Sequence, residues 1–215
     1  MTTPIKAVLF DMDGVLIDAK EWHFEALNQA LTVFGMEISR YDHLVTFDGL
    51  PTRKKLQMLT LERGLPTGLH GLINDMKQQY TMKMVHAHCA PRFVHQFALS
   101  RLRRMGMKIA LCSNSVRDTV GAMMQKADLL RYLDFFLSNQ DVQHGKPDPA
   151  IYQLAVERLG LRADECLVVE DNANGVLAAQ RAGVHVMQVA TVDDVNLANI
   201  LAHVKAAENQ EAVSA

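Results

Sequence analysis

Carboxylic acids stand directly after short apolar runs at two distant places in the chain. Asp11 and Asp13 follow one such run, and Glu170 and Asp171 follow another. A buried strand gains nothing from charges at its end, because unpaired charge is costly to remove from water. Carboxylates in these positions indicate that a cation binds beside them.

Two other apolar runs are followed by groups that suit an anion. Ser113 and Asn114 come directly after the run 108–112, and Lys146 comes after the run 135–138. Ser113 and the backbone amides that follow it stand at a predicted helix start, which favours an anion. The positive charge of Lys146 offsets both the carboxylates and a bound phosphate.

Together these residue types can transfer a phosphoryl group. Asp11 and Asp171, with a carbonyl oxygen and waters, suit a hard ion such as Mg²⁺, and Glu170 suits a supporting or water-mediated place beside it. Asp11 can attack phosphorus and form an aspartyl-phosphate. Asp13 can protonate the leaving oxygen and then take a proton from the attacking water. Two carboxylates are required, because the one that becomes esterified cannot also carry protons.

The elements that must position these groups follow from the apolar pattern. Short apolar runs separated by helical stretches predict buried parallel strands. The runs cover residues 6–10, 108–112, 135–138, 166–169 and 185–190. Helices are predicted at 93–106, 148–160 and 173–183. The first of these helices is expected to carry Phe93, Phe97 and Leu102 roughly on one face. Because ligands of open α/β sheets bind beyond the carboxyl ends of the strands, we expect the polar groups to converge at one edge.

Residues 18–87 interrupt this alternation of strands and helices. Their apolar periodicity predicts helices over residues 21–35, 51–64 and 69–85, and no good strand. We therefore predict an α/β fold with two domains. These are a doubly wound parallel-sheet core of residues 1–17 and 88–215, and an inserted all-helical domain of residues 18–87.

The bulk composition narrows the class of protein. The chain has 215 residues and an apolar share of 49%. Its formal net charge is −2, so it lacks the excess of basic residues that would indicate a nucleic-acid partner. No apolar run approaches the roughly 18 residues that would span a membrane. The three cysteines form no CxxC pair, which argues against a zinc knuckle or a disulfide framework. No signal-peptide pattern opens the chain and no apolar stripe is left over, so we expect a cytoplasmic monomer.

Four segments resemble the motifs of one enzyme family. They are "FDMDGVLID", "LCSNS", "GKPDP" and "VVEDNANG", each at the end of a predicted strand or just beyond it. In this order they resemble the four motifs of the haloacid dehalogenase (HAD) superfamily of phosphotransferases, which implies a Rossmann-like core. The helical insertion after the first motif resembles the α-helical cap of the branch that contains β-phosphoglucomutase and many sugar-phosphate phosphatases.

The resemblance also implies roles for individual residues. It implies Asp11 as nucleophile and metal ligand, and Asp13 as acid and base with its backbone carbonyl on the metal. It implies Asp171 as a metal ligand that Glu170 supports. The residues that it places on the phosphate are Ser113, Asn114 and Lys146.

Positions in and beside the insertion depart from the family pattern or stay open. Many relatives carry Ser or Thr directly after "LID", where this chain has Ala19, and the change bears on cap motion. His23 either faces the active site, as the resemblance suggests, or is a half-exposed helix residue. Arg53 either reads the distal part of a substrate or is solvated beside Lys54 and Lys55, and it stands one place away from the corresponding arginine of the mutase.

The favoured function is a Mg²⁺-dependent phosphatase of a small phosphorylated metabolite, with a sugar phosphate as the expected substrate. A helical lid would exclude bulky substrates and bulk water. A β-phosphoglucomutase-like mutase is an alternative, since the same Asp11 and Asp13 serve both reactions. A phospho-accepting signalling module is a second alternative, because it too uses an Asp, a Lys and Mg²⁺ on a doubly wound sheet. The large insertion and the presence of Asp13 argue against that module.

Overall fold

The computed structural model describes residues 3–47 and 49–214, with side chains up to residue 209. The chain divides into two compact units. One unit is Met1–Asp18 together with Ala90–Ala215, and the other is Ala19–Cys89. The first unit contains a sheet with helices, and the described residues of the second form helices and loops. The α/β class with an inserted all-helical part is therefore confirmed, while the domain limits at residues 18 and 87 stay a prediction.

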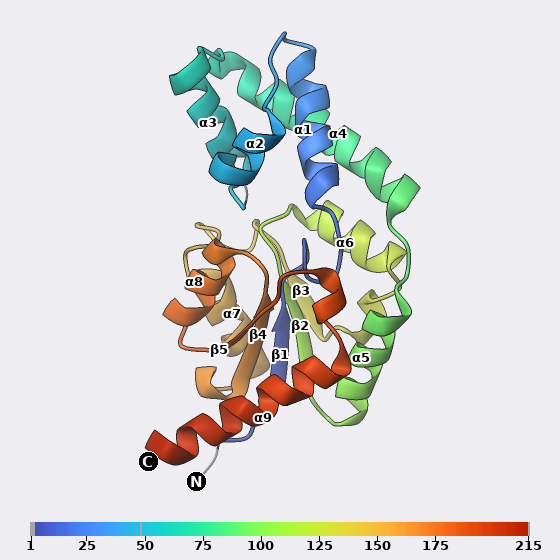
Figure 1. Ribbon diagram of the computed structural model, residues 1–215, viewed down its shortest axis with the longest axis vertical. Helices are drawn as coiled ribbons and strands as arrows, with labels where there is room; N and C mark the ends of the chain where they lie inside the picture. The colour runs from blue at the N-terminus through green and yellow to red at the C-terminus, as the bar shows by residue number, and fades with distance from the viewer. Residues whose placement is uncertain (1–2, 48, 215) are drawn as a thin grey trace. The chain divides into compact units, whose positions relative to one another are not determined.

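Within the described residues, five strands form one parallel sheet in the order β3-β2-β1-β4-β5 (Figure 1). The strands are β1 (Ala7–Phe10), β2 (Lys108–Cys112), β3 (Phe135–Leu137), β4 (Cys166–Glu170) and β5 (His185–Gln188). They confirm the strands predicted from the apolar runs, with small differences at their ends. Continuous apolar runs form these strands because both faces of the sheet are covered by helices.

The register brings three strand ends to one level. The central strand β1 pairs with β2 on one side and with β4 on the other, and Phe10 lies opposite Leu111 and Val169. The chain builds β2 and β3 on one side of β1 and then crosses to build β4 and β5 on the other side. Ligands of open α/β sheets bind outside the strand ends at such a reversal. In this protein the reversal lies between β1 and β4.

Helices cover both faces of the sheet. They are α5 (Phe93–Arg104), α6 (Arg117–Lys126), α7 (Ala150–Leu159), α8 (Ala173–Arg181) and α9 (Leu197–Ser214). Short 3₁₀ helices lie at Leu130–Tyr132, Ala163–Glu165 and Val192–Asp194. Helices α7 and α8 pack on the face that carries Leu9, Ala110 and Val168. Helices α5 and α9 pack on each other over the opposite face (Figure 1).

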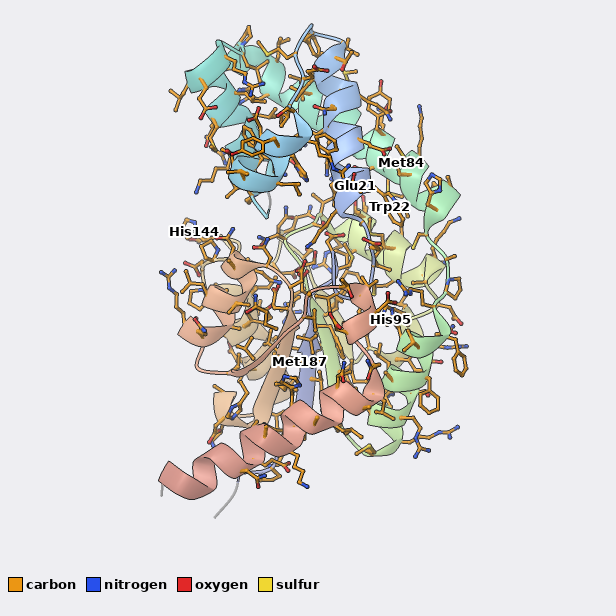
Figure 2. All side chains as sticks on the ribbon, viewed as in Figure 1. Glu21, Trp22, Met84, His95, His144 and Met187 are labelled. Atoms are coloured by element: carbon orange, nitrogen blue, oxygen red, sulfur yellow. The ribbon has the colours of Figure 1, made fainter. Side chains whose placement is uncertain are left out.

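The buried face of α5 differs from the prediction. Leu102 is buried, but Phe93 and Phe97 are 79% and 45% exposed, and their rings stack with centroids 5.9 Å apart. The buried face instead carries His95 (Figure 2), whose Nε2 lies 2.9 Å from the carbonyl oxygen of Val192. The predicted face was wrong because the nine steps from Phe93 to Leu102 make about two and a half helical turns, which puts these two side chains on opposite sides of the helix.

The second unit is built from helices around a small apolar core. Its elements are α1 (Lys20–Thr32), α2 (Arg40–Asp42), a π-helical turn (His43–Phe47), α3 (Thr52–Arg63), a 3₁₀ helix (Thr67–Leu69) and α4 (His70–His88). Helices α1, α3 and α4 confirm the three predicted helices, whereas α2 and the π-helical turn were not predicted. The core residues are Leu27, Ala30, Leu31, Ile38, Phe47, Leu56, Leu59, Leu65 and Ile73.

Neither disulfides nor membrane-crossing helices contribute to the fold of the described residues. Cys89, Cys112 and Cys166 are free, buried thiols. No helix there combines the length and the apolar character needed to cross a lipid bilayer. Burial raises the pKa of Cys112 and of Cys166 to about 12. Both thiols therefore stay protonated at neutral pH.

A side-chain clamp holds the loop after α1 within the helical unit. Asn28 Nδ2 donates to the carbonyl oxygen of Ile38 at 2.8 Å, and Asn28 Oδ1 accepts from the backbone N–H of Ile38 at 2.8 Å. Ile38 belongs to the core of this unit although it lies outside any helix. The amide of Asn28 thus satisfies both backbone groups of a core residue.

Replacing Asn28 with Ala should destabilise the helical unit by about 1–3 kcal/mol, because both backbone groups of Ile38 lose their partner. Trp22 is the single tryptophan of the chain and lies on α1 (Figure 2), so its fluorescence reports this unit. Urea unfolding followed at Trp22 measures the change. Gln29→Ala, at the exposed neighbouring position, is the control and should stay within about 0.5 kcal/mol of the wild type. Equal effects of the two substitutions would contradict the clamp.

Candidate active site

Asp11 stands at the carboxyl end of the central strand. Its backbone N–H donates to the carbonyl oxygen of Val169 at 3.0 Å, so the ladder between β1 and β4 continues one residue past Phe10. The residue is buried. A carboxylate in such a place requires a positive charge or hydrogen-bond donors close by, since its own hydration is lost.

The ammonium of Lys146 is the partner of Asp11. Lys146 is buried in the segment between β3 and α7, and its Nζ lies 2.6 Å from Asp11 Oδ1 and 2.6 Å from Glu170 Oε1. The amine also donates to the carbonyl oxygen of Cys112 at 2.7 Å. All three hydrogens of the ammonium are therefore used, by acceptors at the ends of β1, β2 and β4.

Glu170, the last residue of β4, is held by three donors. Its Oε1 accepts from Lys146 and from the hydroxyl of Tyr152 on α7, which lies 2.5 Å away. Its Oε2 accepts from the backbone N–H of Asp171 at 3.2 Å. On α8, a Cβ added at Gly175 would lie 1.9 Å from Glu170 Oε1 and 2.0 Å from Glu170 Cδ. Glycine is therefore required for α8 to pass this close to the carboxylate.

Burial governs the ionisation of this cluster. Burial raises the pKa of Asp11 well above its ordinary value; Lys146 lowers it, and the charges of Glu170 and Asp13 raise it. Burial alone would favour the neutral amine of Lys146, but the charges of Asp11 and Glu170 outweigh it and raise the pKa of Lys146. Lys146 thus stays a cation at neutral pH. A further positive charge beside Asp11 would favour the ionised carboxylate.

Carboxylates from two strand ends meet closely enough to share a metal ion. Asp11, Glu170 and Asp171 each offer an oxygen, and these oxygens all lie within 4.8 Å of one another. Lys146 can compensate only one of these negative charges. A set of oxygen donors with excess negative charge is what Mg²⁺ prefers in proteins. The donor set is therefore compatible with Mg²⁺.

Asp13 lies in a tight loop after β1. The backbone N–H of Gly14 donates to the carbonyl oxygen of Ile17 at 2.7 Å, and Gly14 has a φ of 84°, a conformation that favours glycine. The hydroxyl of Ser115 donates to Asp13 Oδ2 at 3.0 Å. This bond joins the loop after β1 to the loop after β2 and restrains Asp13 two residues beyond Asp11.

The loop after β2 carries two of the residues predicted to bind phosphate. Ser113 is buried, and its Oγ accepts from the backbone N–H of Ser115 at 3.0 Å. Asn114 Oδ1 accepts from the backbone N–H of Lys146 at 3.0 Å, and Asn114 Nδ2 donates to the carbonyl oxygen of Lys146 at 3.3 Å. Helix α6 begins only at Arg117, later than the helix start predicted at Ser113, and Asn114 is bonded instead to the segment that carries Lys146.

His23 and Arg53 belong to the helical unit, where they lie on α1 and α3. Arg53 is exposed on α3, and the nearby Lys55 is buried rather than solvated. His23 is half-buried on α1, and its Nδ1 lies 3.2 Å from Nζ of Lys77, a buried residue of α4. The contact of His23 and of Arg53 with a substrate stays a prediction.

The structure brings the predicted residues of the sheet unit to one edge, while their roles in catalysis stay predictions. The residues that lie at strand ends or in the loops beyond them are Asp11, Asp13, Ser113, Asn114, Lys146, Glu170 and Asp171. The contacts within this group join the ends of β1, β2 and β4 to the segment after β3.

Sequence reasoning missed three positions that shape the site: Ser115, Tyr152 and Gly175. Tyr152 falls within the apolar stripe of α7 beside Ile151, and a tyrosine in a buried stripe needs a partner for its hydroxyl. Gly175 stands inside a predicted helix, where glycine is unfavourable unless it permits a close approach. Ser115 carried no comparable signal, because only the three-dimensional fold brings its hydroxyl to Asp13.

The residues of this site lie within a segment that matches a known protein family. A family model described as haloacid dehalogenase-like hydrolase matches residues 8–189. The matched range contains the ends of β1, β2 and β4 and the segment that carries Lys146. It also contains the whole of the helical unit, Ala19–Cys89.

Individual relatives agree with the family match. A phosphorylated carbohydrates phosphatase from Thermotoga maritima is 29% identical over 183 residues, which cover 84% of this chain and 82% of the relative. A phosphoglycolate phosphatase from Photorhabdus laumondii is 26% identical over 183 residues, which cover 83% of this chain and 77% of the relative.

A solved structure extends the comparison to the fold. The crystal structure of β-phosphoglucomutase from Clostridium difficile matches with a TM-score of 0.81 and covers 97% of this chain and 99% of that one. At 18% identity this likeness shows a shared fold and nothing finer. The family match spans most of the chain and includes the buried cluster of Asp11, Lys146 and Glu170, so this chain belongs to the haloacid dehalogenase-like hydrolase family.

Proposed function

We propose that this hydrolase is a Mg²⁺-dependent phosphatase of a small phosphorylated metabolite, with a sugar phosphate as the expected class, and that it acts through an aspartyl-phosphate on Asp11. One observation carries the proposal: Lys146 Nζ is buried 2.6 Å from both Asp11 Oδ1 and Glu170 Oε1. Burying such charges together is costly. Buried charges with strongly shifted pKa values at a ligand-binding sheet edge are typical of catalytic sites.

The residues that would hold Mg²⁺ are Asp11, Glu170 and Asp171, with the backbone carbonyl of Asp13 as a further oxygen ligand. Bound there, Mg²⁺ would offset negative charge on the carboxylates and on the transferred phosphoryl group. The raised pKa of Asp11 supports this assignment. With the positive charge of Lys146 beside it, the carboxyl of Asp11 still resists the ionised form that a nucleophile needs.

Asp11 and Asp13 divide the covalent step from the proton transfers. A carboxylate oxygen of Asp11 bonds to phosphorus while the bond from phosphorus to the ester oxygen breaks. Asp13 gives its proton to the departing oxygen and then takes a proton from the water that attacks the phosphoryl-aspartate. Release of inorganic phosphate restores Asp11. The hydroxyl of Ser115, 3.0 Å from Asp13 Oδ2, would restrain the carboxyl group of Asp13 during these proton transfers.

The phosphoryl oxygens would be bound by Ser113, Asn114 and Lys146. Lys146 brings the positive charge, and Ser113 brings a buried hydroxyl from the loop after β2. Asn114 fixes the backbone of Lys146 through two hydrogen bonds, so it would act on the phosphate partly by holding the lysine in place.

The expected substrate class rests on the sequence relatives. The more similar of the two reported above is named a phosphatase of phosphorylated carbohydrates. The likeness to the β-phosphoglucomutase of Clostridium difficile is one of fold, and the name of the sequence relative favours hydrolysis over the mutase reaction. Incubation with β-glucose 1-phosphate and a bisphosphate primer separates the two: free phosphate supports hydrolysis, and glucose 6-phosphate supports a mutase.

Residues 18–87 would form the cap domain that selects the substrate, with His23 and Arg53 as candidate contacts. Once a screen of phosphorylated metabolites identifies a substrate, His23→Ala and Arg53→Ala should raise its KM. An unchanged KM in both variants would remove this part of the proposal. We also expect a cytoplasmic monomer, which size-exclusion chromatography and cell fractionation can test.

Asp11→Asn should lower the turnover of an aryl phosphate in the presence of Mg²⁺ by at least about 1000-fold, because an amide cannot replace the nucleophile. The wild type should lose activity in EDTA. Asp118→Asn makes the same chemical change at an exposed position of α6 and should leave turnover unchanged. Turnover that survives either EDTA or Asp11→Asn would remove the proposal.

Gly175→Ala should lower turnover by about 100-fold or more, because the new methyl group would overlap the carboxylate of Glu170 and displace it. The matched control is Gly121→Ala on α6, where a Cβ would meet only Phe136 Cζ at 3.9 Å. That change should leave activity intact and stabilise the fold by about 0.5–1 kcal/mol. Equal activity in the two alanine variants would contradict the placement of Glu170.

The stability of the metal-free protein should depend on Asp11 in a pH-dependent way. Its raised pKa means that, above the ordinary carboxyl pKa of about 4, the folded chain keeps a proton that the unfolded chain has lost. The contribution of Asp11 to stability therefore falls as pH rises. The measurement is the difference between the urea unfolding midpoints of the wild type and of Asp11→Asn in EDTA. This difference, wild type minus variant, should be larger at pH 5 than at pH 8. A difference that does not change with pH would refute this.

A further inference from the structure

Tyr152 is a buried side chain whose hydroxyl has no part in the proposed reaction steps. It lies on α7 within the apolar core of the sheet unit. Its hydroxyl donates to Glu170 Oε1 at 2.5 Å, and Lys146 Nζ lies 4.8 Å from the centroid of its ring. One side chain thus contacts both charges of a buried ion pair, the carboxylate through its hydroxyl and the ammonium through its ring.

The hydrogen-bond capacity of Glu170 is divided unequally between its two oxygens. A carboxylate oxygen has about two lone-pair sites. Both sites of Oε1 are used, one by Lys146 and one by Tyr152, whereas Oε2 accepts from the backbone N–H of Asp171. Oε2 is therefore the oxygen of Glu170 that can approach a cation, or a water on that cation, without loss of a hydrogen bond.

We propose that the hydroxyl of Tyr152 is a positioning group for the cation site, which fixes Oε1 of Glu170 and so reserves Oε2 for the ion or one of its waters. The inference rests on the proposed function, because it takes the carboxylate cluster of Asp11, Glu170 and Asp171 to be a Mg²⁺ site. Tyr152 acts through Glu170 and not on the reacting atoms.

A second donor on Oε1 matters because Lys146 has other partners. Its ammonium is shared among Asp11, Glu170 and the carbonyl oxygen of Cys112. When a phosphate oxygen takes one of these hydrogen bonds, Tyr152 still holds Glu170. Without the hydroxyl, Lys146 is the one remaining donor described for Oε1, and Glu170 can turn about the contact of Oε2 with Asp171. Loss of an outer partner of this kind typically lowers metal affinity by about 10- to 100-fold.

Tyr152→Phe tests the hydroxyl alone, since phenylalanine keeps the ring, its packing and its contact with Lys146. Calorimetric titration of Mg²⁺ into the full chain, without substrate, should give a Kd at least about tenfold higher than that of the wild type. A Kd equal to that of the wild type would overturn the inference and leave the proposed function standing. A wild-type protein that binds no Mg²⁺ would overturn both.

Two control variants separate this role from a structural one. Tyr132→Phe removes a phenol hydroxyl elsewhere in the same unit, beside Arg131, and should leave the Kd for Mg²⁺ unchanged. Ile151→Val removes a buried methyl group from the position next to Tyr152 on α7 and should lower the unfolding midpoint without changing the Kd. A loss of Mg²⁺ affinity in Ile151→Val equal to that in Tyr152→Phe would assign the effect to loosened packing and overturn the inference.

Discussion

The ammonium of Lys146 is the interaction on which the architecture of this site depends. It binds acceptors at the ends of three adjacent strands: Asp11 after β1, the carbonyl oxygen of Cys112 in β2, and Glu170 in β4. Two of these acceptors are buried carboxylates, and removal of their shared cation would leave uncompensated charge in the interior, which typically costs about 3–5 kcal/mol. The strand order makes the arrangement possible, because β1 lies between β2 and β4.

The residues around this ion pair hold its charged groups in place or leave space for them. Asn114 fixes the backbone on which Lys146 stands, and Tyr152 and Gly175 approach Glu170 from two different helices. On α7, the hydroxyl of Tyr152 donates a hydrogen bond to Glu170, and on α8, Gly175 leaves room for the carboxylate because it has no side chain. The negative charges still exceed the positive one, which is the condition under which a divalent cation becomes a favourable ligand.

Much of this could be predicted from the sequence, because buried parallel strands are continuous apolar runs whose ends can be located to within a residue or two. Asp11, Lys146 and Asp171 could be assigned to one sheet edge in this way. The partners of each side chain could not, because they depend on distances between elements: the amide of Asn114, predicted to bind phosphate, bonds to the backbone of Lys146.

Short or weakly periodic segments were also beyond the sequence pattern. The α2 helix and the π-helical turn after it, residues 40–47, are each too short to show a hydrophobic period. On α5, the aromatic rings of Phe93 and Phe97 suggested a buried face, but the helix buries the face of His95, Ala98 and Leu99. Composition alone cannot choose between two faces of one helix when both carry apolar residues.

The sheet also ends in a way that limits contact with other chains. Its edge strands in the described residues are β3 and β5, which have three and four residues. The free backbone groups of an edge strand are where a foreign strand can add to a sheet, and very short edges are one way in which proteins prevent this. Edges of three and four residues offer few backbone groups in register, which limits the addition of a foreign strand at either margin of the sheet.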